Sequence, residues 1–246
     1  MKKVLILQMR PEEQAADSEF EAFLRIGELT RDETERFRLE QEKEFAVDLN
    51  SYSAIIAGGS PFDVSCPSHK KSATQKRIES FYDQLFDQVI EQDFPFLGAC
   101  SGNGLLGNYC GVPISNRYSE PVGSVSVFKT ADGYHDPLLS DLKNDFLAFV
   151  GHKEACDYVP QEATLLLSSK DCPVQMFRIK NNIYATQFHP EADANEIMVR
   201  IRTYANFGYF NPDKSDELIA SVQDVETPEA NEILRRFIKV YHHNHS

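Results

Sequence analysis

A cysteine between two glycines is the first feature of this sequence that could do chemistry. The segment Gly98-Ala-Cys100-Ser-Gly102 stands where a short apolar run, Phe94 to Gly98, gives way to a helix expected from about Gly102 to Asn108. A strand, a tight turn and a helix in this order are typical of a nucleophile elbow. Glycines two places either side avoid collisions with the neighbouring strand and helix. Cys100 is therefore the candidate nucleophile.

The helix after Cys100 indicates how the sulfur would be activated. Its unpaired N–H groups and positive dipole end should lower the pKa of the thiol. The backbone N–H of Ser101 would face a developing oxyanion. The alternative is that Cys100 is one more buried structural cysteine and that the glycines only shape a turn. The motif alone leaves both interpretations open.

A thiol nucleophile needs a base, and His189 with Glu191 is the best candidate pair. The run Ile183 to Phe188 predicts a strand, and His189-Pro190-Glu191 follows its carboxyl end, the edge at which the elbow should also lie. Taken singly, these residues could be a strand-end histidine and a helix N-terminal acid. Five further histidines have no acid positioned beside them in the sequence. His69 and His135 fall in polar loops, and the C-terminus that holds His242, His243 and His245 is expected to be frayed.

Alternating strands and helices would position these residues. Apolar runs predict strands at Lys3 to Gln8, about Phe37 to Leu39, Tyr52 to Ala57 and Phe94 to Gly98, and helical spacing predicts helices at about Ser18 to Ile26 and around Ile78 to Ile90. This alternation favours an α/β fold with a parallel sheet. From Gly123 the chain is β-rich, with strands expected at 125–128, 146–150, 164–167, 174–179 and 183–188. We expect one domain, residues 1–246, with a C-terminal helical extension from about 192, in pieces around 197–204 and 233–238.

Composition narrows the classes of partner. The 246 residues carry a formal charge of −13, which opposes binding to nucleic acid. No apolar run approaches the roughly 20 residues of a membrane-spanning helix, so neither a membrane nor secretion is expected. Five cysteines without paired spacing fit a reducing, cytoplasmic location and propose no metal site. No phosphate loop suggests a cofactor.

Several motifs together resemble the class I glutamine amidotransferases, especially their GMP synthase-like stand-alone branch. Ile55-Ile-Ala-Gly-Gly-Ser-Pro61 looks like the oxyanion strand and loop, Gly98-Ala-Cys-Ser-Gly102 like the nucleophile elbow, and Gln187-Phe-His-Pro-Glu191 like the second signature. Val150-Gly-His-Lys-Glu154 and Val159 to Ser168 resemble the segments between them. The resemblance implies a flavodoxin-like, three-layer sandwich with a largely parallel central sheet and helices on both faces.

The resemblance also implies roles for individual residues. Cys100 would attack a γ-glutamyl amide and form a thioester, while the N–H groups of Gly59 and Ser101 hold the oxyanion. His189 would protonate the leaving amine and Glu191 would orient His189, after which water hydrolyses the thioester. The substrate-binding positions implied in the same way are Gly58, Gly104 and His152.

One position departs from the family pattern. The family usually has C-x-G-x-Q, but the fifth position here is Gly104, so a substrate contact is missing. A γ-glutamyl peptidase acting on γ-glutamyl amines or peptides is therefore an alternative to a glutamine hydrolase. A non-catalytic regulatory or binding member of the family is a third interpretation. The chain ends soon after the second signature, so ammonia transfer would need a separate acceptor subunit beside the small γ-glutamyl substrate.

Overall fold

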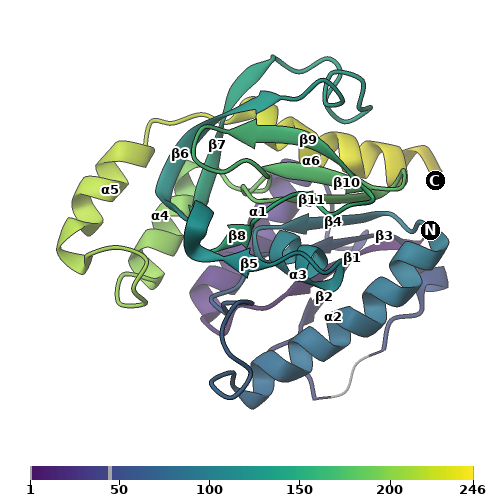
Figure 1. Cartoon of the computed structure of the whole chain (residues 1–246), viewed down its shortest axis with the longest axis horizontal. Helices are drawn as coiled ribbons and strands as arrows, with labels where there is room; N and C mark the ends of the chain where they lie inside the picture. The colour runs from purple at the N-terminus through teal and green to yellow at the C-terminus, as the bar shows by residue number, and fades with distance from the viewer. Residues whose placement is uncertain (1, 44–45, 246) are drawn as a thin grey trace.

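The computed structural model describes residues 2–43 and 46–245, and its centre is a nine-stranded sheet (Figure 1). Five neighbouring strands are parallel: β2 (Thr34–Arg38), β1 (Lys3–Gln8), β3 (Tyr52–Ala57), β4 (Phe96–Ala99) and β11 (Ile183–Thr186). The sheet continues in antiparallel pairing through β10 (Met176–Ile179), β9 (Ala163–Ser169), β6 (Glu120–Lys129) and β7 (Asp145–His152). A separate small pair joins β5 (Ile114–Ser115) to β8 (Ala155–Cys156).

Helices cover both faces of the sheet because its parallel strands are apolar on both sides. On β1, Val4 and Ile6 pack into one buried cluster with side chains of α1 (Glu13–Gly27) and α6 (Pro228–Tyr241). Leu5 and Leu7 point to the other face, where α2 (Ala73–Gln92) and α3 (Ser101–Tyr109) close a second cluster. Successive side chains of a strand alternate between faces, so an unbroken apolar run requires cover on both.

Two further helices extend the molecule beyond the sheet. Figure 1 shows α4 (Ala194–Thr203) and α5 (Ser215–Val222) together, on the side away from both chain ends. They share a small apolar cluster in which Ile197 and Val222 pack with Phe149 of β7. Short 3-10 turns complete the described elements: η1 (Leu49–Ser51), η2 (Asn116–Tyr118), η3 (Pro212–Lys214) and η4 (His243–His245).

The flavodoxin-like α/β class is confirmed, with differences in detail. The first helix begins at Glu13 rather than Ser18, and α5 was not predicted. The expectation of a frayed C-terminus is wrong for His242, which is only 1% exposed. It follows directly on α6, whose apolar face packs on the sheet. The single-domain organisation stays a prediction. Within the described residues, no helix combines the length and apolarity needed to span a membrane.

Candidate active site

Cys100 occupies a strained turn between β4 and α3. Its φ of 52° and ψ of −97° lie where side chains other than glycine are rarely found. The turn is held on both sides: the Cys100 N–H donates to Thr186 O on β11 at 2.8 Å, and the Gly104 N–H donates to Cys100 O at 3.1 Å. The neighbouring strand and the first turn of α3 together impose the strained conformation. This is the geometry expected of a nucleophile elbow.

The two flanking glycines are needed for close packing. A Cβ at Gly98 would lie 2.8 Å from the carbonyl carbon of Gly102, and a Cβ at Gly102 would lie 3.3 Å from Ala57 O on β3. The first distance is too short for any real contact, and the second is tight against backbone. Glycine at these positions therefore lets α3 approach the strand before the turn and its neighbour in the sheet.

His189 and Glu191 meet just beyond the end of β11. The two side chains are joined by a hydrogen bond of 2.9 Å between His189 Nδ1 and Glu191 Oε1, and both are buried. The His189 N–H donates to Phe149 O at 3.0 Å, which fixes the backbone of the histidine against β7. Asn231 of α6 donates its side-chain amide to the carbonyl of Pro190 at 2.9 Å. The pair is thus held in place by several elements.

The pKa values favour a neutral thiol beside a neutral imidazole. Burial raises the pKa of the Cys100 thiol to about 11, although Arg10 and Arg200 oppose the rise. The expectation that the helix lowers this pKa is wrong: the loss of water around the sulfur outweighs the nearby positive charges. Burial, reinforced by Arg200, lowers the pKa of His189 to about 4. At neutral pH both groups are therefore uncharged.

A buried network of charges surrounds the His189–Glu191 pair. Arg200 donates to Glu191 Oε1 at 2.7 Å and also pairs with Glu196, while Arg10 donates to Glu19 Oε1 at 2.8 Å. Arg200 lies 3.6 Å from the same Glu19 oxygen, so the two pairs form one network. Three carboxylates against two guanidinium groups leave one negative charge in excess. Burial raises the pKa of Glu196 to about 7, and protonation of Glu196 makes the network neutral.

The two backbone N–H groups expected to hold an oxyanion, those of Gly59 and Ser101, differ in their hydrogen-bond acceptors. The Gly59 N–H donates to Glu19 Oε1 at 3.2 Å, and the Ser60 N–H donates to Ser101 Oγ at 2.8 Å. The Ser101 N–H has no acceptor among the described residues. Ser101 thus offers its donor directly, whereas Gly59 would have to exchange its carboxylate acceptor for an incoming oxyanion.

Cys100 lies where two pockets meet. The first is lined by His189, both arginines of the network and two tyrosines, along with apolar side chains. The second is lined by Gly104, Gln187 and charged side chains. The residues common to both pockets are Ser60, Cys100, Gly151 and Tyr209. A bond attacked by the sulfur could thus have one half in each pocket.

Comparison with known proteins agrees with this geometry. The model of the family described as "Glutamine amidotransferase class-I" matches residues 30–201, which include both the elbow and the His189-Pro190-Glu191 turn. The chain belongs to this family. Among solved structures, a glutamine amidotransferase from Thermotoga maritima superposes with a TM-score of 0.76 at 19% identity, covering 98% of this chain and 99% of its own. At that identity the likeness establishes the fold.

Curated relatives of this class I amidotransferase include single subunits of glutamine-hydrolysing GMP synthases. The protein of Methanococcus vannielii is 27% identical over 109 residues, which are 44% of this chain and 56% of the relative. The protein of Sulfurisphaera tokodaii is 28% identical over 160 residues, which are 65% of this chain and 77% of the relative. The chain therefore spans little more than half the length of the Methanococcus relative.

The three positions expected to bind substrate lie in different surroundings. Gly104 lines the second pocket, and a Cβ there would meet only Val64 at an ordinary 3.6 Å. Gly58 lies over Glu19, whose carboxylate a Cβ would meet at 2.6 Å, and it lines neither pocket at Cys100. His152 borders the second pocket, but both its ring nitrogens are engaged, by Glu120 at 2.8 Å and by the Glu154 carbonyl at 3.1 Å.

Several site residues were not found from the sequence. Arg10 follows the end of β1, so its place at the carboxyl edge of a parallel sheet was a usable signal. Arg200 and Glu196 lie on α4 and Glu19 on α1, in ordinary amphipathic helices with no local signal. Tyr204 and Tyr209 come from the segment after α4 and reach Cys100 only through the tertiary fold.

Proposed function

We propose that this chain hydrolyses a γ-glutamyl amide through a thioester on Cys100. The observation that carries the proposal is the meeting of a strained elbow cysteine with a hydrogen-bonded His189–Glu191 pair at one pocket. Membership of the class I amidotransferase family supports it. The reaction would begin as His189 takes the thiol proton while the sulfur attacks the γ-carbonyl carbon.

The intermediate then places negative charge on the former carbonyl oxygen. The Ser101 N–H would receive this oxygen, and Gly59 would join it on releasing Glu19 Oε1. Protonated His189, stabilised by Glu191, gives its proton to the leaving nitrogen, and the carbon–nitrogen bond breaks. Water then attacks the thioester, with His189 again accepting a proton, and glutamate and free thiol are released.

Trapping of the acyl-enzyme tests this function. Mass spectrometry after rapid acid quenching should find a γ-glutamyl adduct on the peptide that contains Cys100, and glutamate should accumulate with turnover. Cys100→Ala is the matched control and should give neither. If no γ-glutamyl amide gives adduct or glutamate while binding persists, the chain is a non-catalytic member of the family.

A second candidate, hydrolysis of γ-glutamyl amines or peptides, is favoured by the two pockets. Free glutamine loses only ammonia, which needs no pocket of its own. Since His189 would protonate the leaving nitrogen and lines the first pocket, that pocket is suited to a larger leaving amine. Arg10 and Tyr204 in its wall could contact a polar or aromatic group there. Comparing kcat/KM for glutamine with that for γ-glutamyl amines of increasing size would separate the two candidates.

Should free glutamine be the better substrate, a separate acceptor subunit would receive the ammonia. The names of the relatives describe subunits of glutamine-hydrolysing GMP synthases, and this partner is inferred by analogy with them. Glutaminase activity that rises on adding an isolated acceptor subunit would support that assembly. Equal activity with and without it would argue for hydrolysis alone.

A further inference from the structure

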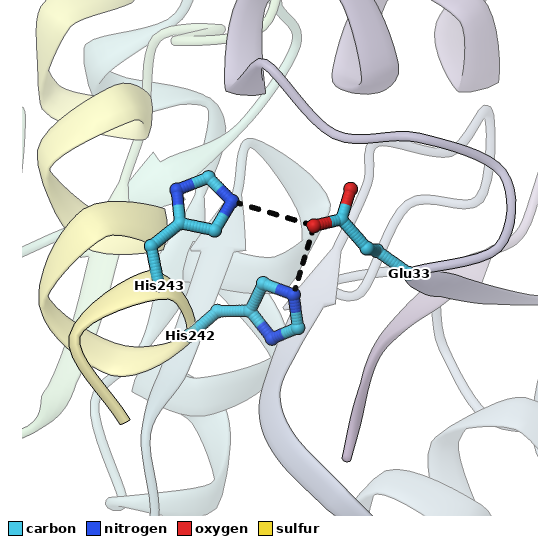
Figure 2. A group of neighbouring side chains, drawn as sticks. All are labelled: Glu33, His242 and His243. Atoms are coloured by element: carbon cyan, nitrogen blue, oxygen red, sulfur yellow. Dashed lines mark ion pairs between the residues drawn. The ribbon is translucent and has the colours of Figure 1, made fainter. Parts of the chain in front are cut away.

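Two histidines and a glutamate converge at the end of α6, outside both pockets at Cys100. Glu33 precedes β2, and His242 and His243 follow α6. Each histidine Nε2 lies 3.8 Å from the same oxygen, Glu33 Oε1. Figure 2 shows the two rings approaching this oxygen from different directions, and the three ligand atoms lie within 4.8 Å of one another.

Neighbouring groups fix the carboxylate. Glu33 Oε2 accepts hydrogen bonds from the Thr30 hydroxyl at 2.6 Å and from the Thr30 N–H at 2.8 Å. These bonds turn Oε1 toward the two imidazoles. Such outer hydrogen bonds are what orient the ligands of metal sites.

A similar contact holds the ring of His242. Its Nδ1 lies 2.8 Å from the Ser53 hydroxyl, which also contacts Lys3 O at 3.3 Å. With Nδ1 engaged by Ser53, Nε2 is the ring nitrogen that faces the carboxylate of Glu33.

We propose that Glu33, His242 and His243 form a binding site for a divalent transition metal ion, with zinc as the best fit. Two imidazoles and one carboxylate are a ligand set that zinc uses, leaving its fourth position for water. Bonds of roughly 2.0–2.1 Å in a tetrahedron place two ligands about 3.4 Å apart. The observed 3.8 Å requires only a small inward movement of the rings.

The position of the site indicates a structural role. Glu33 stands at the start of β2, the outermost strand on one side of the sheet, and the histidines end the last long helix. A bound ion would join segments that are some two hundred residues apart in the sequence. Because only the folded chain brings these ligands together, zinc would stabilise the folded state.

Zinc titration of the full chain tests the site. In the Cys100→Ala background, which removes the active-site thiol as a ligand, calorimetry should find one zinc ion per chain, and zinc should raise the melting temperature. Glu33→Gln and His243→Ala should each weaken binding at least tenfold and abolish the rise. His69→Ala is the matched control, since it removes a histidine elsewhere, and it should bind as the parent does. Circular dichroism would check that all variants are folded.

The competing explanation is binding by the histidine-rich C-terminal sequence alone. In that case a synthetic peptide of residues 237–246 would bind zinc as tightly as the protein, and Glu33→Gln would change neither affinity nor melting temperature. Either result would overturn the proposal. Absence of binding to the folded parent at micromolar zinc would overturn it equally.

Discussion

At Cys100, burial and electrostatics act in opposite directions, and burial prevails. Arg10 and Arg200 favour the thiolate, but the thiol pKa is still raised to about 11. Because the pKa of His189 is lowered to about 4, this residue remains an uncharged base over the neutral range. These values indicate that the resting thiol is uncharged over the neutral range, so no thiolate would be stored before a substrate arrives.

Two alkylating reagents should distinguish these possibilities. Iodoacetamide should modify Cys100 slowly at pH 7 and faster as the pH rises toward 11, because it depends on thiolate already present. A γ-glutamyl diazoketone, which can use the site and its base, should label Cys100 at pH 7. Peptide mapping measures both rates. Rapid labelling of Cys100 by iodoacetamide at pH 7 would show that the thiol is ionised.

Substitutions at the base and its orienting acid should differ in severity. His189→Ala should abolish turnover nearly as fully as Cys100→Ala, because no other group would accept the thiol proton. Glu191→Gln should leave measurable activity, since the amide can still hold the ring although it no longer stabilises its charged form. Steady-state kinetics on one substrate would compare them. High activity of His189→Ala would make His152 the next residue to test.

Gly104→Gln should raise kcat/KM for free glutamine relative to larger γ-glutamyl amides. The helix has room for the Cβ, and the added amide would give the second pocket a polar contact. A tenfold gain corresponds to about 1.4 kcal/mol of transition-state stabilisation. Gly104→Ala, which adds the Cβ without the amide, is the control and should keep the parental substrate ratio. An unchanged ratio in both variants would place specificity in the loops around Pro61 to Ser68 and His152 to Tyr158.

At the scale of elements, the junction of β4 and α3 determines the site. The turn is stabilised by β11 on one side and by the close approach of Gly98 to Gly102 on the other. The His189-Pro190-Glu191 turn is held separately, by α6 through Asn231 and by β7 through the His189 N–H. Movement of either support would change how Cys100 and His189 lie relative to one another.

Gly98→Ala should therefore disturb both stability and activity. Its Cβ would lie 2.8 Å from backbone of Gly102, so α3 would have to shift, at a cost of about 2 kcal/mol. Gly123→Ala is a matched control, because nothing lies within 4 Å of a Cβ there. Urea unfolding and acyl-enzyme formation would be measured for both. Equal stability and activity of the two variants would contradict a requirement for close packing at the elbow.

For the whole molecule, the buried charge network links the candidate active site to α1 and α4. Glu19 of α1 and Glu196 of α4 contact the same two arginines that surround the His189–Glu191 pair. Buried charges of this kind are stable only when each has a partner, so the network couples the positions of α1 and α4 to the pair. The first pocket at Cys100 and the buried charge network thus share Arg10 and Arg200.

The pH dependence of stability should report on this network. The pKa of Glu196 is raised from 4.5 to about 7 in the folded state, so its contribution is full below pH 4.5 and is lost as the pH rises through 7. The free energy of unfolding would fall by at most about 3 kcal/mol. Glu196→Gln should remove this decrease between pH 5 and 8, measured by urea unfolding. A parental decrease retained in the variant would assign it to another group.

The alternation of strands and helices and the main motifs of the candidate site could be predicted from the sequence. Tyr52–Ala57 and Lys3–Gln8 were predicted with the observed bounds, because buried parallel strands leave short apolar runs between turn residues. Cys100 and the His189–Glu191 pair were identified because each lies in a local pattern, an elbow or the turn after a strand. Such patterns involve residues only two or three positions apart, so they can be recognised without knowing any long-range contact.

The surroundings of these residues could not be predicted, because they depend on long-range contacts in the folded chain. Three features join segments that are separated in the chain. They are the ion pair of Arg10 with Glu19, the second pocket beside Gly104, and the contact of Glu33 with His242. The raised pKa of the Cys100 thiol has the same origin, since burial depends on every element packed around the sulfur. Local sequence specifies the turn that presents the thiol, but the free energy of its charge depends on how much water the folded chain removes.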